Sequence, residues 1–107
     1  MTKNAILAAC KLACRVSGDF LDDEINDLID SAFLDLEISG IANTEGVPYS
    51  ADSADSLVLT AVKTYVKINL GDLLDVSEIE KLSRSYWDQK ALLKMRRWSD
   101  SVIGGES

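Results

Sequence analysis

Carboxylates are the most abundant chemistry-bearing side chains of this chain, and eleven of them lie between Val16 and Val62 without a single Lys or Arg. Closely spaced carboxylates can bind a divalent cation or exchange protons with a substrate. Residues 19–24, however, lack the glycine and the terminal bidentate glutamate of a calcium-binding loop. Asp23 and Asp27 are neighbours on a predicted helix, but no second group is positioned there for acid–base chemistry. The run therefore indicates a solvated acidic face.

The rest of the composition gives little support to an enzymatic function. The chain has no histidine, which is the commonest general base and metal ligand, and no phosphate-binding glycine motif or C-x-x-C pair. Cys10 and Cys14 are four residues apart on a predicted helix, where Cβ atoms lie about 5–6 Å apart, too far for an unstrained disulfide. We therefore expect small buried thiols, and no catalytic residue, metal or cofactor.

Length and composition predict one soluble domain covering residues 1–107. The chain is 47% hydrophobic and 27% charged, with a formal charge of −7. A chain of this size buries roughly 60–70% of its unfolded surface, so it can fold alone with a thin margin. No apolar run approaches the roughly 18 residues of a membrane span, and we expect a cytoplasmic location without membrane contact.

Four segments show helical spacing of apolar residues, and none shows the sustained alternation of a strand. We predict an all-α bundle with helices over about residues 2–16, 23–39, 53–70 and 77–99, a long loop at 41–52 and a frayed tail at 104–107. Asp22 is a candidate N-cap, Gly40 with Ile41 fits a Schellman ending, and Ser77 with Glu80 fits a capping box. The third helix has the least polar surface, so its expected core residues are Val58, Ala61, Val62, Tyr65 and Val66.

Two of the helices carry apolar residues outside their main stripes. Leu34 and Ile38 fall within the acidic face of the second helix. The fourth helix has a second stripe consisting of Trp87, Ala91, Met95 and Trp98. A long fourth helix that wraps over the bundle would bury both stripes, whereas subunit contact would use them, and aromatic residues, Met and Arg are enriched in interface cores. The candidate partner-binding residues are Leu34, Ile38, Trp87, Met95, Arg97 and Trp98.

Charge is also segregated along the chain. Residues 84–98 contain five bases and a single acid, Asp88, in contrast to the acidic middle of the chain. Helix-dipole chemistry explains part of this pattern, with acids at the start of the second helix and bases at the end of the fourth. The remainder favours head-to-tail association, in which the basic face of one subunit meets the acidic face of the next and a ring closes.

Three segments resemble the small head–tail connector, or adaptor, proteins of tailed phages and prophages. Residues 22–36, with the closing Ser39-Gly40-Ile41 that follows them, resemble that family's first long helix. Residues 59–71 resemble its central helix, and residues 80–87 resemble its C-terminal helix. The resemblance implies a virion protein, assembled in the host cytoplasm, that forms a homo-oligomeric ring between the portal protein and tail or stopper proteins. DNA would pass through this ring without specific binding. The resemblance transfers no active-site residue.

Two other hypotheses stay open at the level of sequence. An acidic phage-encoded regulator could mimic DNA and occupy a basic groove of its partner, which explains the charge of −7 equally well. It explains Trp87 and Trp98 less well unless these residues form a dimer. An unspecialised helical domain is the third possibility.

In a connector, carboxylates lining the channel would repel DNA, and the loop at 41–52 could reach the lumen or a neighbour.

The charge distribution predicts that this protein does not bind duplex DNA tightly at physiological salt. Tight binding requires Lys and Arg facing the phosphates, whereas this chain has a net charge of −7. A fluorescence titration of random-sequence duplex should show no submicromolar, salt-sensitive association. Such binding would contradict the prediction and would direct attention to the bases at 84–98.

Overall fold

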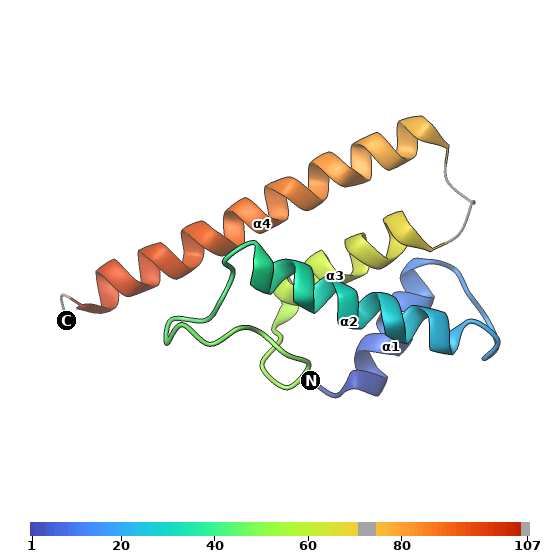
Figure 1. Ribbon diagram of the computed structural model, residues 1–107, viewed down its shortest axis with the longest axis horizontal. Coiled ribbons are helices and arrows are strands. Elements are labelled where there is room, and N and C mark those ends of the chain that lie inside the picture. The colour runs from blue at the N-terminus through green and yellow to red at the C-terminus, as the bar shows by residue number, and fades with distance from the viewer. Residues whose placement is uncertain (71–74, 106–107) are drawn as a thin grey trace.

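The chain folds into an all-α bundle. The computed structural model describes residues 1–70 and 75–105, with side chains of the last helix described as far as Arg96. These residues form α1 (Lys3–Ala13), α2 (Asp22–Ile38), α3 (Ser56–Asn69) and α4 (Val76–Gly105), as Figure 1 shows. The predicted fold class is therefore confirmed.

The helix α3 is the centre of the bundle, because it packs against α1, α2 and α4. At about 1.5 Å per residue, the 30 residues of α4 are about 45 Å long, close to the 49 Å long axis of the molecule. The C-terminal end of α4 extends past the other helices (Figure 1). One side of α4 is therefore anchored on the bundle, while much of its remaining surface is free.

All four helices contribute to one hydrophobic core. The predicted core residues of α3 are confirmed except that Tyr65 lies at the edge, half-buried, with its ring 5.7 Å from that of Tyr86 in α4. Each fully buried aliphatic side chain contributes about 1.5–3 kcal/mol relative to exposure. The helical residues of the core are Ile6, Cys10, Ile25, Ile29, Ala32, Leu36, Val58, Ala61, Val62, Val66, Tyr86 and Leu93.

The ends of α2 follow local chemistry. Gly40 adopts φ +83°, and the Ile41 N–H donates to the Leu36 carbonyl over 2.9 Å, so the predicted Schellman ending is confirmed. The predicted N-cap at Asp22 is wrong, because α2 already includes that residue. The Asp22 carboxylate instead forms an ion pair with Lys11 over 2.8 Å, which joins α2 to α1.

The starts of α3 and α4 also differ from the predicted ones. The Asp55 carboxylate accepts hydrogen bonds from the Leu57 and Val58 N–H groups, so α3 begins at Ser56 and not at residue 53. Asp75 accepts a hydrogen bond from the Glu78 N–H over 2.8 Å, so α4 begins one residue before the predicted capping box. The helix continues to Gly105, beyond the predicted end at 99, and residues 106–107 of the predicted tail lie outside the described part.

Both cysteines carry free thiols, in agreement with the prediction from their spacing. Cys10 is buried, and its burial raises the pKa of the thiol to about 12. Cys14 is half-buried, and burial raises its pKa as well. Both thiols therefore stay protonated at neutral pH. Among the described helices, none is long and apolar enough to cross a membrane.

We predict that Val62→Asp unfolds the protein, because Val62 lies fully buried in the central helix. Burying an unpaired carboxylate costs several kcal/mol, against a total stability of about 5–15 kcal/mol. Thermal melting followed by circular dichroism tests this. Thr60→Asp on the exposed face of α3 is the matched control and should melt like the wild type. A cooperative melt of the Val62 variant near the wild-type temperature would contradict the assignment.

Candidate subunit interface

A buried ammonium group joins α2 to α4. Lys90 is only 7% exposed, and its Nζ lies 3.2 Å from the Asp35 carboxylate and 3.1 Å from the Ser39 hydroxyl. The Tyr86 hydroxyl donates to the same Asp35 oxygen. Because a buried charge is tolerated only when it is paired and hydrogen-bonded, this cluster fixes how α4 lies against α2.

Two aromatic rings complete the surroundings of the Lys90 ammonium. Its Nζ lies 4.8 Å from the centre of the Tyr86 ring and 4.5 Å from that of Trp87, within the range of cation–π attraction. Burial and the neighbouring Asp35 carboxylate raise the pKa of Tyr86, so its hydroxyl remains a proton donor. Lys90 thereby also restrains the orientation of the Trp87 ring.

A second polar contact fastens α4 further along its length. The Arg96 guanidinium donates to Asp55 over 2.7 Å and to the Tyr49 hydroxyl over 2.8 Å. Partial burial raises the pKa of Asp55, but the hydrogen bonds from the Val58 N–H and Arg96 outweigh it, so that pKa is lowered. The ionised Asp55 therefore caps α3 and ties α4 to the start of that helix.

Four of the candidate partner-binding residues are exposed on these fastened helices. The exposed fractions are 54% for Leu34, 74% for Ile38, 67% for Trp87 and 63% for Met95. The alternative in which α4 wraps over the bundle and buries both stripes is therefore wrong for the described residues. The side chains of Arg97 and Trp98 lie outside the described part of the chain. Leu92, which the sequence did not single out, is also exposed.

Three of these exposed residues flank the same junction. With 100° of rotation per residue, Leu34 and Ile38 lie on the solvent side of the row formed by Asp35 and Ser39. Trp87 lies on the flank of α4 that borders this junction, because its ring packs against the Lys90 ammonium and that ammonium reaches Asp35 in α2. Met95 continues the stripe along α4, two turns further. We call Leu34, Ile38, Trp87 and Met95 the apolar face.

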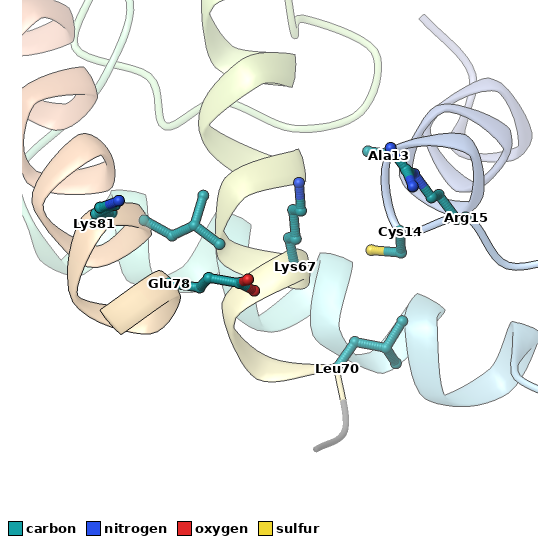
Figure 2. Close-up of a pocket in the computed structure, with 8 residues that line it drawn as sticks. Ala13, Cys14, Arg15, Lys67, Leu70, Glu78 and Lys81 are labelled. Carbon is teal, nitrogen blue, oxygen red and sulfur yellow. The ribbon is translucent and has the colours of Figure 1, made fainter. Parts of the chain in front are cut away.

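A cleft of about 610 Å³ lies elsewhere, between α1, α3 and α4 (Figure 2). The pKa of Cys14, the thiol among the described lining residues, is raised by burial despite the nearby Lys67, so this thiol is not an activated nucleophile. In the described part of the chain, no three acidic or cysteine side chains are grouped closely enough to hold a metal ion. The residues that line the cleft are Ala13, Cys14, Arg15, Lys67, Leu70, Glu78, Lys81 and Leu82.

Comparison with known proteins gives one family. The family model described as "Phage connector protein" matches residues 6–99. No curated protein and no solved structure gives a significant match. The matched span includes the Lys90 junction, the described residues of the apolar face and the cleft.

We predict that Asp35→Ala destabilises the protein by about 2–3 kcal/mol, because it leaves the Lys90 ammonium buried without its carboxylate. Urea denaturation measures the loss. Asp27→Ala, an exposed acid on the same helix, is the matched control and should change stability by less than about 0.5 kcal/mol. Equal denaturation midpoints for the two variants would show that Lys90 does not depend on Asp35.

Proposed function

This chain belongs to the phage connector protein family, and on that premise we propose that it is a ring-forming subunit of the head–tail connector of a tailed phage or prophage. The ring would lie between the portal protein and the tail or stopper proteins, and DNA would pass through its channel. The role is structural, and we expect it to require neither catalysis nor a cofactor.

The observation that carries this proposal is the apolar face. Single exposed apolar residues are normal on a monomer, but here four large ones are each more than half exposed on two fastened helices. Exposed apolar patches mark sites of association, and Leu34, Ile38 and Trp87 flank the same Lys90 junction. Trp87 has the properties of an interface anchor, since tryptophan is among the residue types that dominate binding energies.

The junction beneath the apolar face supports its use in binding. Because Lys90 is held by Asp35, Ser39 and two aromatic rings, the helices do not need to be ordered when a partner arrives. Preorganised surfaces lose less conformational entropy on association. A connector must hold its shape under the load of capsid and tail, so rigid helical surfaces suit this role.

The loop between α2 and α3 is a second candidate for contacts in the assembly. The Asn43 side chain accepts hydrogen bonds from the Glu45 and Val47 N–H groups over 2.9 and 3.0 Å, and Ala42 pairs with Pro48. The loop is thus an ordered projection with Val47 exposed near its tip. We propose that it reaches either the channel or a neighbouring subunit.

The net charge of −7 suits a channel through which DNA moves. Carboxylates facing the duplex would repel its phosphates, so the wall would not retain the DNA. An acidic DNA mimic would share this charge, but family membership and the apolar face favour the connector. The assembly experiment below separates the two, because a mimic would ignore the portal ring.

We predict that Trp87→Ala combined with Leu34→Ser weakens assembly by at least about thirtyfold while the subunit stays folded. Truncating an interface anchor commonly costs at least about 2 kcal/mol. Sedimentation velocity at rising concentration, alone and with purified portal rings, measures the effect. Phe20→Ala with Leu12→Ser, two exposed apolar residues near the turn between α1 and α2, is the matched control and should assemble normally. A wild-type protein that remains monomeric and ignores the portal would contradict the connector function.

A further inference from the structure

The outward surface of α2 is an acidic stripe that ends in two apolar residues. The stripe has the spacing i, i+4, i+7, i+11 and i+15, which is one face of a helix. It lies opposite the buried side of α2, and all of its side chains are exposed. We call this stripe the acidic ridge; its residues are Asp23, Asp27, Asp30, Leu34 and Ile38.

A basic groove runs along α3, between α1 and α4. Lys67 is exposed on α3, and Lys63, one turn earlier, is half-buried; the charge of Lys63 acts on the thiol of Cys10 in α1, and that of Lys67 on the thiol of Cys14 at the end of α1. Arg15 at the end of α1 and Lys81 from α4 line the cleft that continues this face (Figure 2). The basic groove is defined by Arg15, Lys63, Lys67 and Lys81.

The groove combines charge with apolar surface. Glu78 is the only acid among the described residues that line the cleft, and Leu70 and Leu82 are among its apolar lining residues. Among the described residues, none of the four bases of the basic groove forms an ion pair. Its positive charge is therefore available to a partner.

The ridge and the groove lie on opposite sides of the molecule. Val58 faces the core shared with α2, whereas Lys67 is nine residues further along, which is half a turn away around the axis of α3. Because the two surfaces face away from each other, they cannot meet within one subunit. Among the ridge acids, only Asp30 forms an ion pair among the described residues, with Lys3 over 2.9 Å.

We propose that the acidic ridge of one subunit docks into the basic groove of a second copy of this chain. Asp23 and Asp27 would face the groove bases, and Leu34 with Ile38 would add apolar contact. Such a contact is heterologous, because it joins two different surfaces, and it generates a ring when the rotation between neighbouring subunits closes. The inference rests on the proposed connector function and specifies which two surfaces form its ring.

The basic groove differs from the basic surface that the sequence predicted, which was residues 84–98. Within residues 84–96, Lys90 and Arg96 are occupied by internal pairs with Asp35 and Asp55. Arg84 and Lys94 form no ion pair among the described residues, but neither lines the cleft, whereas Arg15, Lys67 and Lys81 do. Complementary charge of this kind fixes the register of an interface and excludes wrong partners.

The experiment reverses the charge of each surface in turn. The groove variant is Lys63→Glu with Lys67→Glu, and the ridge variant is Asp23→Lys with Asp27→Lys. Each should lower the association constant of the subunits by about a hundredfold, measured by sedimentation velocity alone and on portal rings. An equimolar mixture should recover association, because the intact ridge of the groove variant fits the intact groove of the ridge variant.

The matched control reverses a charge elsewhere. Asp19→Lys lies in the exposed segment between α1 and α2, outside the acidic ridge, the basic groove, the apolar face and the loop, and should assemble like the wild type because Lys11 keeps its closer ion pair with Asp22. Since Asp23 is in the first turn of α2, Asp27→Lys alone serves as a second ridge variant that leaves this turn intact. Melting curves establish that each variant is folded.

The outcomes distinguish the docking from the function. If the wild type assembles and the folded groove and ridge variants assemble like the controls, the docking is wrong while the connector function stands. If both variants lose association but their mixture does not recover it, the head-to-tail contact is wrong. A wild type that neither self-associates nor binds portal rings contradicts both proposals.

Discussion

The ammonium group of Lys90 imposes the constraint on which the arrangement of the long helix depends. A charged side chain buried in the middle of α4 is stable only with a carboxylate and further hydrogen-bond partners around it. Asp35, Ser39 and the Tyr86 ring supply them, and Asp35 and Ser39 lie on α2. The rotation of α4 about its own axis follows, because Lys90 must face α2 while Leu93 faces the core.

That rotation determines which surfaces remain for partners. With Tyr86, Lys90 and Leu93 turned inward, Trp87 and Met95 are left outside, and the opposite flank of α4 borders the cleft. The proposed ring requires more than one binding surface on each subunit, since each copy would contact two neighbours and the proteins above and below. The bundle provides such surfaces without enlarging its core, which suits a chain of 107 residues.

The outer surfaces of the bundle differ in the sign of their charge. The acids of α2 and the bases around α3 are separated by the body of the bundle, although the whole chain carries a charge of −7. Internal ion pairs use Lys3, Lys11, Lys90 and Arg96, three of them at helix–helix contacts. Asp23 and Asp27 of the ridge and the four bases of the groove stay outside these pairs among the described residues and lie on separate surfaces, a division that favours head-to-tail contact over symmetric pairing.

The sequence by itself determined the fold class, most of the α3 core and the ending of α2 at Gly40, because helical periodicity and a glycine at positive φ act over a few residues. It also singled out Leu34, Ile38, Trp87 and Met95. The starts of α3 and α4 were predicted at the wrong residue, because Asp55 and Asp75 supply the caps of these helices. Only the tertiary structure decided that Lys90 pairs with Asp35, 55 residues away, and that Lys67 shares a cleft with Arg15 and Lys81. Such contacts depend on how the helices pack, which local spacing does not specify.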